Sequence, residues 1–399
     1  MRWTRWLCAA SLLLLVVQGT VFAAEGSKPF QLNNRLRVEY DDNIYQSGTL
    51  PDGSDTLEAK KGGFKVIEEV DFLVNLNLEN TYISLRYRPQ FVWWENREPD
   101  KTDFNNDLDF VLNHDFSPRL SLSLMDTLRR GELPELQEGN ILVREEDDFY
   151  YNSANGTLSY LFRPTTKLEV AGRYILLKYD DAVTADNENY NTYVGGLTLR
   201  HSLQAKTTIL GDLRYEFTDY DGLDRGSKNI YAGAGVEQTF NPSLIGNLRG
   251  GWQQKKFNMD DLGTENSPYG DLSLTILPSP ATRITLGASY MLYQANVYPY
   301  ADQKQLQAYC SLAYDITAKI AWYLSGGYTL SDYSQDYAAA DKLISPDGKE
   351  NIYQASTRLT YKINRNNWLE AGYQFVDFDS DLRVSYKRNR VDVGWKIQL

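Results

Sequence analysis

The carboxyl-terminal stretch, residues 386–399, constrains the fold of this chain more than any other part of the sequence. Every second side chain near its end is apolar: Val391, Val393, Trp395, Ile397 and Leu399. The residues between them are charged, polar or glycine, so an extended strand here has one apolar and one polar face. Such a strand at a chain end leaves an aggregation-prone edge unless another strand pairs with it. Pairing with the first strand would close a β-barrel; the edge of a soluble β-sandwich is the alternative.

The same alternation recurs in extended runs that are joined alternately by tight turns and by longer polar loops. Eight tight joints are expected near residues 79–80, 117–118, 163–165, 202–204, 241–242, 278–280, 316–318 and 364–366. Nine longer loops are expected at 46–62, 96–102, 131–145, 181–186, 219–226, 258–266, 296–302, 333–349 and 380–385. The pattern predicts an all-β fold, an antiparallel up-and-down barrel of about 18 strands, with both chain termini on the side of the short turns.

Two other β architectures compete with a barrel. Hairpins begin every 36–39 residues between 166 and 317, close to the length of a propeller blade, but each repeat holds two strands rather than four. A soluble sandwich seldom needs so many strands in one unbroken meander. Strands of about 13 residues also exceed the ~9–11 that cross a membrane at a tilt. The sequence therefore favours a transmembrane barrel with short periplasmic turns and longer extracellular loops.

The amino terminus has the features of an export signal. Arg2 and Arg5 precede an apolar run at 7–17, and Val21-Phe22-Ala23 suits a signal peptidase. We therefore predict a signal peptide at 1–23 and a barrel at 24–399. Removal of the two arginines changes the formal charge from -12 to -14, which argues against a nucleic-acid partner. Only Cys310 remains after processing, so no intramolecular disulfide is expected.

The polar face of the strands carries charges of both signs. A barrel of this width leaves a water-filled lumen, which these side chains would line. The candidates for the lumen are Arg86, Arg88, Asp107, Asp109, Arg214, Arg249, Arg283, Arg358, Arg388 and Arg390. Such a wall suits charged or hydroxyl-rich solutes. The alternative is that these residues pair across strands and serve register alone.

Three stretches carry a resemblance to known proteins. Asp392, Gly394, Ile397 and Leu399 are similar to the carboxyl-terminal insertion signal of bacterial outer-membrane barrels, although that family usually ends in Phe. Residues 36–46, LRVEYDDNIYQ, and 70–91 resemble the opening of a family of outer-membrane β-barrel porins that is often associated with exopolysaccharide or capsule operons. The resemblance implies a barrel with a transport role and assigns no functional residue. Asp41, Asp42 and Asn43 match the opening motif; their alternative role is to end a strand at the outer rim.

Enzymatic chemistry finds little support in the sequence. The two histidines, His114 and His201, lie beside predicted tight turns, and no Gly-x-Ser-x-Gly elbow is present. Ser117 and Ser202 lie near them in sequence, so a Ser–His pair is the one catalytic alternative. We predict no catalytic residue, no cofactor and no enzymatic activity.

Acidic and aromatic residues gather near the predicted loops. The acidic loops could hold Ca²⁺ or Mg²⁺, but none has the spaced glycine and final glutamate of a calcium loop, so no metal site is predicted. Trp93 and Trp94 precede a loop, while Trp322 and Trp368 follow tight turns, as rings of an aromatic belt would. Trp94 points inward if Trp93 points outward, and it then either stacks on a sugar or packs beneath a loop.

These observations predict a porin that lets hydrophilic solutes pass by diffusion, with poly- or oligosaccharides as the favoured class through the family resemblance. The expected partners are outer-membrane lipid, lipopolysaccharide, the barrel-assembly machinery and periplasmic polysaccharide-export components. The alternative is a structural or surface-attachment barrel that binds cations, lipopolysaccharide or matrix and whose lumen is occluded by loops. The candidate occluding loops are 46–62, 131–145 and 333–349.

Overall fold

The computed structural model describes residues 29–56, 59–98, 100–131, 148–222, 225–259, 262–295, 300–336 and 348–399. The predicted signal peptide at 1–23 lies outside the described residues, as do nearly all of loop 131–145 and most of loop 333–349. The position of the signal cleavage site therefore stays a prediction.

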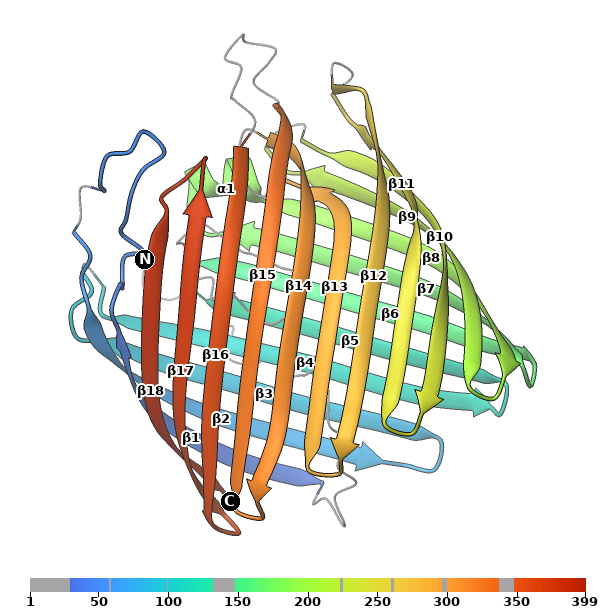
Figure 1. Ribbon diagram of the computed structural model, residues 1–399, viewed down its shortest axis with the longest axis horizontal. Coiled ribbons are helices and arrows are strands. Elements are labelled where there is room, and N and C mark those ends of the chain that lie inside the picture. The colour runs from blue at the N-terminus through green and yellow to red at the C-terminus, as the bar shows by residue number, and fades with distance from the viewer. Residues whose placement is uncertain are drawn as a thin grey trace, which may run out of the picture.

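Eighteen antiparallel strands form one sheet that curves into a closed barrel (Figure 1). They are β1 (Phe30–Asp41), β2 (Gly63–Asn77), β3 (Thr81–Trp94), β4 (Thr102–Ser117), β5 (Leu120–Gly131), β6 (Phe149–Arg163), β7 (Thr166–Tyr179), β8 (Tyr190–Gln204), β9 (Thr207–Tyr220), β10 (Ser227–Asn241), β11 (Leu244–Phe257), β12 (Thr264–Ser279), β13 (Thr282–Gln294), β14 (Tyr300–Thr317), β15 (Ile320–Asp336), β16 (Gly348–Asn364), β17 (Asn367–Ser380) and β18 (Tyr386–Gln398). Short turns join them at one end of the barrel, the turn end, and longer segments at the other, the loop end.

The barrel closes where β1 pairs with β18. Leu36 lies opposite Trp395 and Val38 opposite Val393, while β1 pairs on its other side with β2. The chain end is fixed as well, because the Leu399 N–H donates to the Leu32 carbonyl at 2.8 Å. The predicted barrel and its 18 strands are thus confirmed. Seven of the eight tight turns overlap their predicted positions; the one predicted at 202–204 lies at 205–206, because β8 continues through a bulge.

The two faces of the sheet differ as the alternation predicts. The outward side chains of the closing strand, Val391, Val393 and Trp395, are 49%, 59% and 45% exposed, although they are apolar. A belt of exposed apolar side chains on one face of a closed sheet is the surface that hydrocarbon covers in a membrane barrel. Of the belt tryptophans, Trp93 and Trp322 face outward. Trp368 does not, because its register partners are the lumen-facing Lys362 and Lys396.

The one described helix is α1 (Ala182–Glu188), in the segment between β7 and β8. Asp181 caps it, since its carboxylate accepts hydrogen bonds from the backbone N–H groups of Thr184 and Val183, which hold the pKa of Asp181 below its usual value. The sequence analysis predicted only a loop here. Within the described residues, no helix has the length and apolar character needed to cross a membrane.

One hairpin leaves the wall at the loop end. β12 pairs with β11 as far as Thr264, but its ladder to β13 stops at Gly270, opposite Tyr290. In Figure 1 the upper end of β13 turns away from β12, which continues upward. Leu292 would face outward by alternation, yet it is fully buried, because this part of the hairpin lies against the inner face of β10 and β11. We call residues 291–295 and 300–305 the inward hairpin.

Candidate solute pathway

A network of ion pairs lines the lumen around the closing seam. Arg358 on β16 donates to Glu370 on β17 at 3.2 Å and to Asp392 on β18 at 3.1 Å. Arg35 on β1 reaches the same Glu370 carboxylate at 2.8 Å. Gly372 leaves the room for this arrangement, because a Cβ there would lie 2.2 Å from an Asp392 oxygen. Four strands thus share their charges across the seam.

The network continues on β2, β3 and β4. Arg86 donates to Asp71 at 2.6 Å, and Arg88 donates to Asp107 at 3.0 Å, with Asp109 at 4.0 Å. Arg86, Arg88, Asp107 and Asp109 lie on the inner face of the sheet, and each arginine is paired with a carboxylate. The alternative weighed from the sequence, cross-strand pairing, holds here together with the lumen position.

The remaining candidates are spread around the barrel. Arg388 donates to Asp41 at 2.9 Å, and Arg390 is buried on the same face of β18. Arg249 lies 3.6 Å from Glu237. Arg214 donates to Asp212 at 3.2 Å and lies against the rings of Tyr231 and Tyr269. Arg283, half-buried near the turn end, is far from the seam network.

A second sector of the lumen is almost free of charge. On β13, β14 and β15 the lumen face carries mainly hydroxyl, amide and glycine groups, in register from strand to strand. They include Thr285, Gly287, Ser289, Gln305, Gln307, Ser311, Ser325, Gly327 and Thr329. Sequence analysis missed this sector because it searched for charged groups. The alternation of Ser, Thr and Gln on these strands was the signal that could have found it.

The inward hairpin narrows the lumen at the loop end. Gln253 on β11 donates to the Leu292 carbonyl at 2.7 Å and accepts from the Leu292 N–H at 3.3 Å. Arg225 donates to the Ala295 carbonyl at 3.2 Å, and Gln294 donates to the Arg225 carbonyl at 2.9 Å. The end of β13 is thereby bound to β11, two strands away along the wall, and to Arg225 in the segment before β10. None of the three predicted occluding loops includes β13 or the start of β14.

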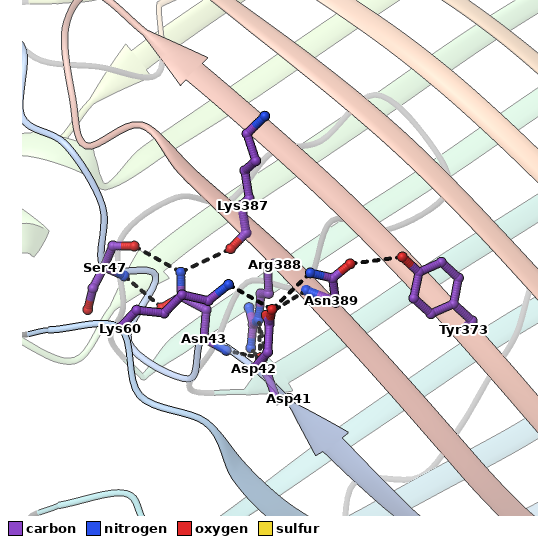
Figure 2. A network of polar contacts seen from close by, with 9 residues as sticks. All are labelled: Asp41, Asp42, Asn43, Ser47, Lys60, Tyr373, Lys387, Arg388 and Asn389. Carbon is purple, nitrogen blue, oxygen red and sulfur yellow. Dashed lines mark hydrogen bonds and ion pairs between the residues drawn. The ribbon is translucent and has the colours of Figure 1, made fainter.

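The three residues of the opening motif fasten the loop end of the seam, and we call them the seam clasp (Figure 2). Asp42 accepts from the backbone N–H of Asn389 at 2.7 Å and from its side chain at 2.8 Å. Asn43 donates to the Lys387 carbonyl at 3.2 Å, and Asp41 binds Arg388. The first strand is thus held to the last by three consecutive residues, which agrees with a position at the rim.

Lys60 and Asn389 set the ionisation of Asp42. Partial burial by itself would raise the pKa of this carboxyl group, but the hydrogen bonds from Asn389 and from the Lys60 ammonium at 2.7 Å outweigh it. The net result is a pKa below the usual value. Asp42 is therefore ionised at neutral pH. Loop 46–62 also crosses this region, where the Thr49 N–H donates to the Ser385 carbonyl at 2.9 Å.

The Ser–His pairs considered from the sequence do not form. His114 hydrogen-bonds with Thr81 at 2.8 Å and His201 with Thr166 at 2.9 Å, while Ser202 pairs with Thr208. Ser117 accepts from the backbone of its own turn. Over the described part of the chain, no three His, Cys, Asp or Glu side chains lie close enough to hold a metal ion.

Trp94 packs beneath a loop and offers no surface for a sugar. It is 2% exposed and packs with Ile44, Ile67 and Val92. Its indole N–H donates to Asp103 at 2.7 Å. Of the two alternatives weighed for this ring, packing is the one that the structure contains.

Comparison with a protein-family model agrees with this architecture. Residues 164–399 match the model of a family described as "Putative beta-barrel porin 2". The chain belongs to this porin family. No curated protein matches the chain. Among solved structures, Pseudomonas aeruginosa OccK1 (OpdK) shares 12% sequence identity, with 93% of this chain and 99% of its own covered, at a TM-score of 0.49. Pseudomonas aeruginosa OccK2 (OpdF) shares 10% identity, with 93% of this chain and 98% of its own covered, at a TM-score of 0.47. Acinetobacter baumannii OccAB4 gives 0.46 at 10% identity, covering 93% of this chain and 99% of its own.

Membership places the porin in the outer membrane as a β-barrel channel. The residues that resemble an insertion signal have structural roles in it. Gly394 faces the lumen, where a Cβ would lie 2.8 Å from the Arg37 side chain, and Asp392 belongs to the seam network. Ile397 and Leu399 continue the outward apolar row of β18 to the turn end. The link to polysaccharide operons stays a prediction.

Proposed function

We propose that this porin is a passive channel for hydrophilic solutes, with hydroxyl-rich solutes such as oligo- or polysaccharides as the favoured class. The observation that carries the proposal is the division of the lumen face into a charge-paired sector around the seam and a neutral sector of hydroxyl and amide groups on β13–β15. Paired charges present short-range dipoles rather than a net field, so they hydrate the wall without holding one ion tightly.

The inward hairpin supports selection by size. It narrows the lumen at the loop end, so a solute passes beside β13 and β14 and meets their neutral polar side chains. No bond is formed or broken in such passage, and no group of the chain needs to act as an acid, base or nucleophile. The channel therefore requires no cofactor or metal, and the direction of net flux follows the concentration gradient.

Conductance in planar bilayers tests the proposal. The purified, heat-modifiable barrel is expected to give stable current steps, and liposomes that contain it should swell faster in small saccharides than in large ones. A folded barrel that gives no current and no swelling would instead support the structural alternative. The inward hairpin is the observation that favours this structural barrel with an occluded lumen, because it partly fills the lumen at the loop end.

The export and assembly steps are part of the same proposal. We propose that residues 1–23 are a cleaved signal peptide and that the barrel-assembly machinery recognises the last strand. Lipopolysaccharide would contact the exposed apolar belt, and polysaccharide-export components would dock at the turn end. Amino-terminal sequencing of the protein from outer membranes should read from residue 24 or 25; a start at residue 1 would contradict the first of these steps.

A further inference from the structure

Tyr309, near the middle of β14, has an unusual position for a large aromatic side chain. It is 49% exposed, and its register partners Gly287 and Gly327 place it on the lumen face. The other exposed tyrosines among the described residues, such as Tyr215 and Tyr353, alternate to the outward face. Tyr309 is therefore a half-exposed ring in an aqueous lumen, where the burial of apolar surface does not explain it.

Two glycines make room for this ring. A Cβ on Gly287 would lie 2.2 Å from two ring carbons of Tyr309 and 2.5 Å from its hydroxyl oxygen, so the ring packs directly on the backbone of β13. On the other side, a Cβ on Gly327 would have only the Ala308 carbonyl within 4 Å, at 3.8 Å. One part of the ring is supported by the wall, and the side toward β15 is open.

The groups around the ring are polar and mostly neutral. The neighbouring row toward the loop end holds Asp271, Ser289, Gln307 and Thr329, and the row toward the turn end holds Thr275, Thr285, Ser311 and Ser325. Asp271 is exposed, and its register partner Ser289 places it on the lumen face of β12. An aromatic ring is therefore surrounded by hydroxyl, amide and carboxylate groups within one or two strand spacings, below the inward hairpin.

We propose that Tyr309 is a saccharide-binding platform in the lumen, on which a pyranose ring stacks while its hydroxyls bond to Asp271, Ser289 and Gln307. A pyranose has an apolar face of C–H groups with partial positive charge, which the negative face of an aromatic ring attracts, and an equator of hydroxyls that needs donors and acceptors. The inference rests on the proposed function for the route by which a saccharide arrives, but the site is defined by its own geometry.

Maltohexaose is the probe for the test, used in two measurements on the folded barrel. Calorimetric titration in detergent measures binding, and block of the ion current in planar bilayers measures occupancy of the channel.

Tyr309→Ala should raise the half-blocking concentration and the Kd about fivefold to tenfold, whereas Tyr309→Phe should stay near wild type. Gly287→Ala should act in the same direction as Tyr309→Ala, because the added methyl displaces the ring. The matched control is Tyr215→Ala, an equally exposed tyrosine on the outward face.

The outcomes separate the two proposals. Binding that is absent in wild type, or equal in wild type and Tyr309→Ala, overturns the platform. Equal block by a polyethylene glycol of the same size also overturns it, because the interaction would then be steric. Binding that depends on Tyr309 in a barrel without conductance supports the platform and overturns the channel.

Discussion

Single glycines decide whether the lumen charges can meet. Gly372 lies opposite Arg358 on one side and Asp392 on the other, and only a hydrogen fits between these two side chains. Gly394 likewise leaves room for the Arg37 side chain, which would lie 2.8 Å from a Cβ at this position. In a strand interior glycine is unfavourable, so its presence at these places indicates a close approach of neighbouring groups. The ion pairs of the seam therefore depend on residues that carry no charge.

Gly372→Ala should destabilise the barrel by about 1–3 kcal/mol, because the new methyl group forces Asp392 away from Arg358. The matched control is Gly195→Ala, where an added Cβ meets nothing within 4 Å. Urea midpoints of the two variants, measured by the heat-modifiable gel shift, provide the comparison. Equal midpoints would show that the seam network tolerates the methyl group.

Asp42 should make the stability of the seam depend on pH. Its pKa is lower in the folded protein than in the unfolded chain, so its contribution is complete above the unfolded value of about 4 and is lost as pH falls through the folded value. Asp42→Asn should cost about 1–3 kcal/mol at pH 7, through the lost ion pair with Lys60 and the weaker hydrogen bonds from Asn389, and progressively less below about pH 4.

Unfolding midpoints from pH 7 to pH 3 check this expectation. Asp55→Asn removes an exposed carboxylate from the same segment between β1 and β2 and is the control. If the unfolding midpoints of wild type and Asp42→Asn differed by the same amount from pH 7 to pH 3, a role for ionised Asp42 would be contradicted.

At the scale of elements, the alternation of side chains predicted the strands but not the path of the inward hairpin. The alternation of apolar and polar residues shows only which face of a strand is polar. In residues 291–305 this alternation is consistent with strands that stay in the barrel wall. What bends the hairpin is a set of contacts between distant strands, such as Gln253 with Leu292, that no local pattern contains. Pro268 was a partial signal: it lacks an N–H, and it lies on the part of β12 that β13 has left. Trp368 was assigned to the aromatic belt because it follows a tight turn, but it lies on the lumen face. Proximity to a turn does not determine which face of the sheet a side chain occupies.

Gln253→Leu should loosen the inward hairpin. The change removes both hydrogen bonds to the Leu292 backbone and leaves buried polar groups without partners, at a cost of about 1–3 kcal/mol. We expect a larger mean conductance and more frequent current fluctuations in planar bilayers. Gln254→Leu is the neighbouring control, because that side chain is exposed on the outward face. Identical traces for the two variants would mean that the hairpin does not limit the current.

For the whole molecule, closure is the property on which the lumen depends, because an open sheet would expose two unpaired edges in lipid. Leu36 on β1 and Trp395 on β18 face each other in register across the seam.

With Cys310 replaced by serine, Leu36→Cys with Trp395→Cys should cross-link on mild oxidation, since opposite residues on antiparallel strands have Cβ atoms about 4.5–5.5 Å apart. Leu36→Cys with Leu359→Cys should not, because β17 and β18 separate β1 from β16. The cross-linked chain contains a covalent ring of nearly all its strands, so it should migrate differently from the reduced form on a denaturing gel. A seam pair that stays reduced in folded, heat-modifiable protein would mean that the barrel is open there, and the water-filled pathway would then lack a wall.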